Sequence, residues 1–297
     1  NILQGKEKKR ILFYDNIDPI NFKNSLEKFD LMKIGYIIVS KSGSTLETLS
    51  QFSCLIELFE QKKQLEIFYK NCLIITENKL SPLRKIGIQN NCEILDHETE
   101  IGGRYSVFSN VGMVPAIIAG VDVKKIHDGV KYFLSMIESG SIIEFLTIAK
   151  LLTSKKLLYQ VNSCVLLTYT DALFYFGKWY LQLWSESIGK NNVGITPIHA
   201  IGTTDQHSQL QLFLDGPKDK FFTFITTNHS KLGLKINKSV SDKNGMHYLA
   251  DKFMGDLMQA EQQATLDTFL QNKLAYREIY IQKIDEFSIG QLMAFFI

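Results

Sequence analysis

Short apolar runs typical of buried strands alternate with segments of helical spacing along this chain. Strands that alternate with helices form parallel sheets covered by helices on both faces. The pattern therefore predicts an α/β protein, in which each parallel sheet forms a three-layer αβα sandwich. We expect strands at residues 10–14, 34–39, 72–76, 161–170, 194–197, 221–225 and 278–281. We expect helices at residues 22–29, from 46 onward, 120–155, 172–187, 210–214 and 247–271.

The chain is long enough for two domains, since 297 residues exceed the usual size of one small domain. We place the first domain at residues 1–119 and the second at residues 156–297. Residues 120–155 would form a helical connection, because Val130, Phe133 and Ile137 recur at helical spacing. We expect the C-terminal part of the second domain to be missing, because the chain ends in the apolar run 292–297 without a polar cap, and we also expect the N-terminal part of the first domain to be missing.

Composition excludes some partners and favours one compartment. With a net charge of +2, charge gives no support for a nucleic-acid or membrane-surface partner. No apolar stretch reaches the roughly 20 residues that a membrane-spanning helix needs. The four cysteines show no metal-binding spacing. Because Cys54, Cys72 and Cys164 lie in apolar runs, we expect buried thiols and a cytoplasmic protein.

The segment 40–48, SKSGSTLET, lies between a predicted strand and a predicted helix. Backbone N–H groups at a helix N-terminus lack partners within the helix and can bind a phosphate. Gly43 would let the backbone approach the anion closely. The alternative is a capping cluster, in which a Ser or Thr caps the helix and Glu47 lies in its first turn. Because five of these nine residues carry hydroxyl groups, more than a cap needs, we favour a phosphate site.

Three further segments carry groups that could take part in catalysis. In residues 101–106, IGGRYS, two glycines permit a tight turn and Arg104 could stabilise an oxyanion; its local spacing alone favours a plain turn. In residues 182–190, Glu186 lies among apolar residues and could act as a general base, although a solvated carboxylate is more common. Gly189 would cap the end of that helix. In residues 202–208, His207 could be an acid or base, or a bystander beside a cap formed by Thr204 or Asp205.

Taken in this order, the four segments resemble the glucose-6-phosphate isomerase family of sugar-isomerase (SIS) proteins. The segment SKSGSTLET is similar to the family's phosphate-binding SKT-x-T-x-ET motif, and IGGRYS is similar to its GGR[FY]S signature. The ES-x-GK and Gly-x-x-x-Gln-His segments follow in the family's order. The resemblance implies two SIS domains, each with a parallel sheet flanked by helices.

The resemblance also implies an activity and a role for each candidate residue. The family interconverts glucose 6-phosphate and fructose 6-phosphate through a cis-enediol, without a metal or an organic cofactor, in glycolysis and gluconeogenesis. Glu186 would move the proton between C2 and C1, Arg104 would stabilise the enediolate, and Gln182 would line the sugar site. His207 would assist ring opening in the partner subunit's active site, which implies a homodimer. The residues that would bind the phosphate are Ser40, Lys41, Ser42, Thr45 and Thr48.

Two features of the family are not found in the chain. Nothing like the family's GGS loop precedes the first predicted strand, and no DQ-x-GVE-x-x-K segment follows the last. We therefore expect the 297 residues to be an incomplete version with weak or no activity. Two alternative functions stay open, namely a bifunctional glucose and mannose 6-phosphate isomerase and a non-catalytic SIS module that binds sugar phosphates.

Overall fold

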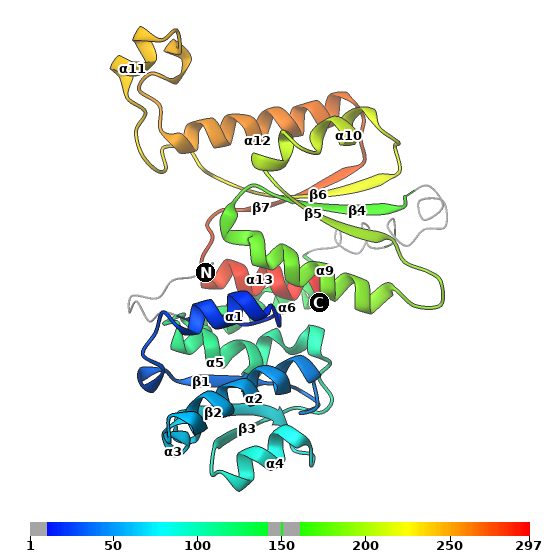
Figure 1. Cartoon of the computed structure of the whole chain (residues 1–297). Helices are drawn as coiled ribbons and strands as arrows, with labels where there is room; N and C mark the ends of the chain where they lie inside the picture. Colours follow the sequence, from blue (N-terminus) through cyan, green and yellow to red (C-terminus); the bar gives the residue numbers. More distant parts are fainter. Residues whose placement is uncertain (1–10, 142–149, 151–160) are drawn as a thin grey trace. The chain divides into compact units, whose positions relative to one another are not determined.

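The computed structural model describes residues 11–141, 150 and 161–297 (Figure 1). The chain divides into two compact units, an N-terminal unit that ends at Val121 and a C-terminal unit from Asp122 to Ile297. Each unit contains a parallel β-sheet with helices packed on it, so the predicted α/β class is confirmed. The division predicted at residues 119 and 156 stays a prediction, because residues 142–149 and 151–160 lie outside the described residues.

The N-terminal unit contains a sheet of three strands in the order β1-β2-β3, all parallel. The strands are β1 (Tyr36–Val39), β2 (Cys72–Glu77) and β3 (Glu93–His97). The helices are α1 (Pro19–Leu26), α2 (Leu46–Gln61), α3 (Leu65–Lys70), α4 (Pro82–Gln89) and α5 (Asn110–Ile118), with the short 3-10 helices η1 (Leu31–Lys33) and η2 (Gly103–Phe108).

Aromatic rings fill the core of the N-terminal unit. Phe59 of α2 stacks on Phe68 of α3 with ring centroids 4.7 Å apart, and Tyr36 of β1 meets the edge of Phe68 at 4.9 Å. All three side chains are buried. Such pairs add packing energy to the burial of apolar area, and they fix α2 and α3 on the first strand.

The C-terminal unit contains a four-stranded parallel sheet in the order β5-β4-β6-β7. The strands are β4 (Ser163–Thr168), β5 (Thr196–Ile201), β6 (Lys220–Thr227) and β7 (Tyr276–Ile281). The helices are α6 (Val123–Glu138), α9 (Phe174–Ile188), α10 (Leu210–Asp215), α11 (Lys238–Lys243), α12 (Met254–Gln271) and α13 (Glu286–Phe296), with the 3-10 helices η3 (Asp171–Leu173), η4 (Thr204–Gln206) and η5 (His247–Leu249).

The two faces of the second sheet are covered by different helices. Helices α10 and α12 lie on one side of the sheet, and α9 and α13 lie on the other (Figure 1). Val165 and Leu167 of β4 belong to the same apolar cluster as Phe269 of α12. Cys164, the neighbour of Val165, packs in a separate cluster with Trp184 of α9. Successive side chains of a strand point to opposite faces, so this alternation places β4 between two helical layers.

Helices α6 and α13 cross at two glycines. A Cβ atom added to Gly129 of α6 would lie 2.0 Å from the carbonyl oxygen of Phe287, and one added to Gly290 of α13 would lie 2.1 Å from that of Ile126. A side chain at either position would therefore force the two backbones apart. The contact makes α6 part of the C-terminal unit, and the predicted helix in residues 120–155 is confirmed for residues 123–138.

Several sequence predictions need correction. The strand predicted at residues 10–14 is wrong for the described residues 11–14, which form no strand and leave Leu12 and Phe13 exposed. The helix predicted at 247–271 begins as α12 only at Met254, where the Asp256 carboxylate accepts the Phe253 N–H at 2.8 Å. Strand β3 was not predicted, because its sequence EILDH carries charged residues at both ends. Cys54 is exposed, not buried.

We expect Gly290→Ala to lower the free energy of unfolding by about 1–3 kcal/mol, the usual cost of overpacking. The reason is the short approach between Gly290 and the Ile126 carbonyl. Urea unfolding of the variant would measure the loss. The control is Gly35→Ala, because an added Cβ there meets nothing within 4 Å. Equal stability of the two variants would contradict the close packing of α6 on α13.

Candidate active site

The loop from Ser40 to Thr45 follows β1 and leads into α2. It therefore lies at the carboxyl edge of the first sheet, where parallel α/β proteins bind their ligands. The Ser40 side chain is buried, and its N–H donates to the Ile75 carbonyl at 3.1 Å. This bond continues the ladder between β1 and β2 by one residue, so the start of the loop is fixed by the sheet.

Thr45 is the N-cap residue of α2, but its side chain makes no capping hydrogen bond. Its hydroxyl pairs with the Ser40 hydroxyl at 2.7 Å instead. Among the described α-helices, the other N-caps of Ser, Asp or Asn type all accept a backbone N–H through their side chains: Asp18, Ser81, Ser109, Asp122, Asn237 and Asp285. The N-terminus of α2 is thus left without the cap that the alternative interpretation required, which suits an anion site.

The remaining hydroxyl groups of the loop surround the same helix start. The Ser42 hydroxyl accepts the N–H of Ser44 at 3.2 Å and its hydroxyl at 3.0 Å. Thr48, in the first turn of α2, donates to the Val39 carbonyl at 3.4 Å. Ser42 and Thr45 are exposed, so both are accessible to a ligand.

Gly43 is required by the shape of the loop. Its φ of +65° is in the left-handed region that favours glycine. An added Cβ would also lie 2.0 Å from the Ser81 hydroxyl. The Gly43 carbonyl accepts the Leu83 N–H at 3.0 Å, so the loop is seated directly on the start of α4.

Lys41 directs its ammonium group away from the helix start. Nζ donates to the carbonyls of Thr99 at 3.0 Å and Ile101 at 2.7 Å, and it lies 3.4 Å from the Glu77 carboxylate. Among the residues predicted to bind phosphate, Lys41 therefore connects the loop to the segment before Arg104.

Arg104 lies in the 3-10 helix η2, directly after the two glycines. Its guanidinium carbon lies 4.6 Å from the centre of the Tyr105 ring. The Ser106 hydroxyl donates to the Gly103 carbonyl at 2.6 Å, and the Tyr105 N–H donates to the Gly102 carbonyl at 2.9 Å. The turn predicted for residues 101–106 is thus a hydrogen-bonded helical turn that presents Arg104 on a partly exposed surface.

In the C-terminal unit, Gln182 and Glu186 lie one turn apart on α9. The Gln182 amide donates to the Glu186 carboxylate at 2.9 Å, and both residues are exposed. Although Glu186 lies among apolar residues in the sequence, they do not bury its carboxylate in this structure. Gly189 caps the C-terminus of α9 as predicted.

His207 is exposed, and its two preceding residues are held tightly. The Asp205 carboxylate accepts the Ile201 N–H at 2.7 Å and the Ser208 hydroxyl at 2.8 Å. The Gln206 amide donates to the Tyr169 hydroxyl at 2.9 Å and also contacts the Thr265 hydroxyl. Asp205 does not cap α10, whose N-cap is Gln209. No local signal pointed to the role of Gln206, since its partners are distant in the chain.

The predicted site residues fall into both units. The loop residues and Arg104 belong to the N-terminal unit, where the Lys41 contacts connect them. Gln182, Glu186 and His207 belong to the C-terminal unit, where a hydrogen bond joins Gln182 to Glu186.

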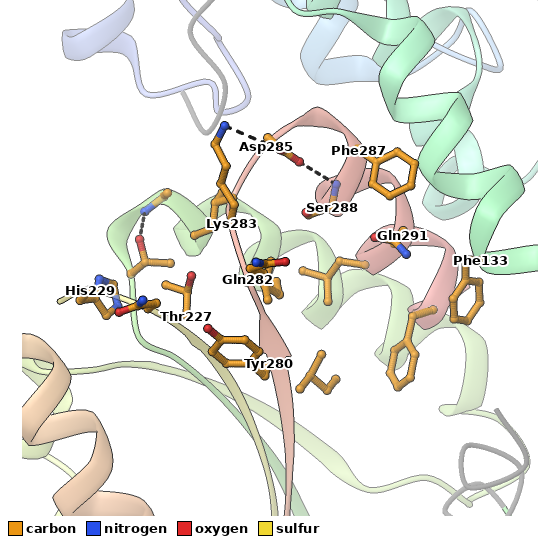
Figure 2. A pocket seen from close by; sticks show the side chains of 18 of the residues that line it. Phe133, Thr227, His229, Tyr280, Gln282, Lys283, Asp285, Phe287, Ser288 and Gln291 are labelled. Carbon is orange, nitrogen blue, oxygen red and sulfur yellow. Dashed lines mark hydrogen bonds and ion pairs between the residues drawn. The ribbon is translucent and has the colours of Figure 1, made fainter. Parts of the chain in front are cut away.

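A cavity of about 1160 Å³ lies at the carboxyl ends of β4, β6 and β7 in the C-terminal unit. Figure 2 shows its lining, which includes Thr227, His229, Lys283 and Gln291 but none of the predicted site residues. His229 donates through Nε2 to the Tyr169 carbonyl at 2.7 Å. Sequence reasoning missed this cavity, because its lining comes from segments that carry no motif.

Burial controls the ionisation of two histidines in the C-terminal unit. Burial lowers the pKa of His229, against the opposing effect of its bond to Tyr169. Burial, assisted by the nearby Lys178, also lowers the pKa of His199, whose Nε2 lies 3.2 Å from the Thr168 hydroxyl. In both cases burial favours the neutral form of the ring.

Burial alone would raise the pKa of Asp205. Hydrogen bonds from the Ile201 N–H and the Ser208 hydroxyl outweigh it and hold that pKa below its usual range. Asp205 therefore stays charged beside His207, where it fixes the backbone of the loop.

Within the described ranges, no group of three or more His, Cys, Asp and Glu side chains is placed to hold a metal ion. Among the described helices, none combines the length and the apolar character needed to cross a bilayer.

The fold and the loop together define an α/β protein built from two parallel-sheet units, with an open helix N-terminus at one sheet edge. A family model described as phosphoglucose isomerase matches residues 2–296. The chain belongs to the phosphoglucose isomerase family, which confirms the resemblance drawn from its motifs.

Two curated relatives illustrate the similarity. The chain is 34% identical to a probable glucose-6-phosphate isomerase of Methanococcus maripaludis, over 95% of this chain and 63% of that protein. It is 33% identical to the glucose-6-phosphate isomerase of Campylobacter jejuni, over 99% of this chain and 72% of that protein. The chain thus spans somewhat less than two thirds of the length of the first relative.

Solved structures agree on the fold. The chain superposes with a TM-score of 0.89 on a hypothetical protein from Thermus thermophilus, at 26% identity, over 99% of this chain and 71% of that one. A glucose-6-phosphate isomerase from Chlamydia trachomatis gives a TM-score of 0.74 at 22% identity, over 95% of this chain and 56% of that one, which bears on the fold alone.

A left-handed backbone costs an alanine about 1–2 kcal/mol. We expect Gly43→Ala to lower the free energy of unfolding by more than this amount. The additional loss comes from the clash with Ser81. Gly140→Ala is the matched control, because Gly140 has a φ of +70° and an added Cβ there meets nothing within 4 Å. Urea unfolding would compare the two variants. Equal losses would show that the loop does not need its close approach to α4.

We expect the free energy of unfolding to fall as the pH drops below about 6.5, the usual pKa of histidine. His199 and His229 have lowered pKa values in the folded protein, so the unfolded chain binds more protons in this range. The stability that these two histidines contribute is fully present above their pKa in the unfolded chain. It is lost as the pH falls toward their lower pKa values in the folded protein. Urea titrations between pH 7.5 and 5 would measure the slope.

Replacing one buried histidine should reduce that slope. His229→Gln keeps a donor for the Tyr169 carbonyl, and it should lower the slope by up to about 1.4 kcal/mol per pH unit. The exposed His127, replaced by Gln, is the control. An unchanged slope in His229→Gln would show that His229 does not contribute to the pH dependence of the free energy of unfolding.

Proposed function

We propose that this chain serves an aldose–ketose isomerase that interconverts glucose 6-phosphate and fructose 6-phosphate through a cis-enediol, as a step of glycolysis and gluconeogenesis. Membership of the phosphoglucose isomerase family supports the proposal, as do the names of the relatives from Methanococcus maripaludis and Campylobacter jejuni. Because the chain spans only 63% of the first relative, the activity is proposed for the protein with its native termini.

The observation that carries the proposal is the start of α2. Its N-cap residue Thr45 makes no capping bond, the loop before it contributes the hydroxyl groups of Ser40 and Ser42, and the first turn of the helix contributes that of Thr48. A phosphate dianion bound here would accept hydrogen bonds from the backbone N–H groups of the first helical turn. The helix dipole would stabilise it further. Binding at the phosphate supplies energy that positions the reacting carbons of the sugar.

The chemistry requires a base and a cation. In the proposed reaction the Glu186 carboxylate removes the proton from C2 of the open-chain aldose, which gives a cis-enediolate. The same group then returns a proton to C1, so the reaction is an internal transfer that needs no external oxidant or reductant. Arg104 stabilises the charge that develops on the sugar oxygen. Gln182 would line the sugar site and supports the base, because its amide donates to the Glu186 carboxylate and orients it.

His207 would assist ring opening by delivering a proton to the ring oxygen as its bond to the anomeric carbon breaks, while the anomeric hydroxyl loses its proton and becomes the carbonyl. Its exposure, on a loop held by Asp205 and Gln206, suits a side chain that acts outside its own subunit. We therefore propose a homodimer in which each subunit completes the active site of the other. The four free cysteines, two of them buried, support a reducing compartment such as the cytoplasm.

The test is Glu186→Gln, measured in the protein produced with its native termini. The amide keeps the size of the side chain and can still pair with Gln182. We expect turnover of fructose 6-phosphate to fall by about 100- to 10,000-fold, the usual contribution of a general base, while binding measured by calorimetry is retained. Asp215→Asn, an exposed change of the same kind, should leave turnover unaltered.

Two outcomes would contradict the proposal. Full turnover by Glu186→Gln would exclude this carboxylate as the base. A wild-type protein that binds fructose 6-phosphate but converts none would be a non-catalytic binding module. Turnover of mannose 6-phosphate at a comparable rate would favour the bifunctional isomerase instead.

A further inference from the structure

Lys41 contacts residues at or just beyond the carboxyl ends of the other two strands of the first sheet. It lies in the loop after β1, and its carbonyl accepts the Glu77 N–H at 3.0 Å and the Thr76 hydroxyl at 3.2 Å, both at the end of β2. Its ammonium donates to the carbonyls of Thr99 and Ile101, which follow β3. A single residue thus connects three chain segments at the carboxyl edge of the sheet.

The ammonium group makes two hydrogen bonds and one ion pair in the N-terminal unit. A lysine has three N–H donors. The three partners are the Thr99 carbonyl at 3.0 Å, the Ile101 carbonyl at 2.7 Å and the Glu77 carboxylate at 3.4 Å. The side chains of Lys41 and Glu77 are only 31% and 17% exposed, so water competes weakly for these bonds. While they hold, two of the three donors of Lys41 are taken by the Thr99 and Ile101 carbonyls, and its charge is paired with the Glu77 carboxylate.

The contact with Ile101 fixes the start of the Arg104 turn. Ile101 directly precedes Gly102 and Gly103, and a Cβ added to Gly103 would meet nothing within 4 Å. The space beside Gly103 is therefore open. The bond from Lys41 to the Ile101 carbonyl ties the start of the turn to the loop after β1, in addition to the hydrogen bonds within the turn.

Arg84 holds Glu77, the acidic partner of Lys41, in place. Its Nη1 donates to the Glu77 carbonyl at 3.1 Å and to the Asp96 carboxylate at 2.7 Å. Asp96 lies in β3, so Glu77 is tied to the sheet from both sides and gives Lys41 a fixed partner. The contacts of Lys41 thus connect the loop of residues 40–45 to the segment before Arg104, and the contacts of Arg84 hold the Glu77 end in place.

We propose that Lys41 is a positioning residue, which holds the Arg104 turn in place relative to the phosphate loop and does not itself bind the phosphate. This inference rests on the proposed function, in which Arg104 stabilises the enediolate. Loss of Lys41 leaves the amides and hydroxyls at the start of α2 in place but lets Arg104 move. A displacement of about 1 Å can cost on the order of 100-fold in rate.

The experiment replaces Lys41 with Met, which keeps the length of the side chain and removes its donors. In the protein with native termini, kcat for fructose 6-phosphate should fall by about 10- to 100-fold. KM, and the affinity for inorganic phosphate measured by calorimetry, should change by less than about threefold. Lys79→Met is the matched control, because Lys79 is an exposed lysine of the same unit, and it should change neither quantity.

The opposite result overturns the proposal. If Lys41 binds phosphate directly, Lys41→Met should weaken phosphate binding by at least about tenfold, as the loss of a charged hydrogen bond would. A variant with unaltered kcat would likewise show that Arg104 does not depend on Lys41.

A second readout is independent of activity. If the wild-type protein turns over no sugar phosphate, the proposed function fails, and hydrogen exchange then decides the role of Lys41. Faster exchange of the amides of residues 102–105 in Lys41→Met than in Lys79→Met would support the restraint on the turn. Equal exchange rates in the two variants would overturn it.

Discussion

Parallel pairing around mostly buried inner strands, β2 in the first sheet and β4 and β6 in the second, is the constraint on which both units depend. The interior of each sheet admits almost no free polar group, so the polar residues collect in the loops at the strand ends. The ladder also extends beyond the strands: the Ser40 N–H and the Lys41 carbonyl both pair with β2 residues. The first part of the phosphate-type loop is therefore held in the same way as the sheet itself.

A second regularity concerns the neighbours of the proposed functional side chains. Lys41 restrains the segment before Arg104, Gln182 bonds Glu186, and Gln206 anchors the loop of His207. Glu186 and His207 are exposed, while hydrogen bonds from neighbouring residues orient the Glu186 carboxylate and hold the loop of His207. This arrangement orients a reactive group without burying it, so little reorganisation is needed when a substrate binds.

The sequence predicted those features that depend on local patterning. The apolar runs indicated the strands of the C-terminal unit, and the hydroxyl-rich turn before α2 pointed to an anion site. It could not predict what depends on distant partners. The 60-residue separation between Lys41 and Ile101, and the 59-residue separation between Gln206 and Thr265, leave no local signal. The run at residues 11–14 was misread because an apolar segment at a surface has the same composition as a buried strand.

The glycine contact between α6 and α13 has a practical consequence for dissecting the protein. In chain order α6 precedes β4, yet its backbone is seated against Phe287 and Gly290 near the end of the chain. A recombinant fragment cut just before the first strand of the second sheet would lose this helix and uncover the apolar side of α13. A fragment that begins at Asp122 would retain the helix. In a fragment without it, the surface of α13 around Gly290 would be the binding site for a separately supplied α6 peptide in a complementation experiment.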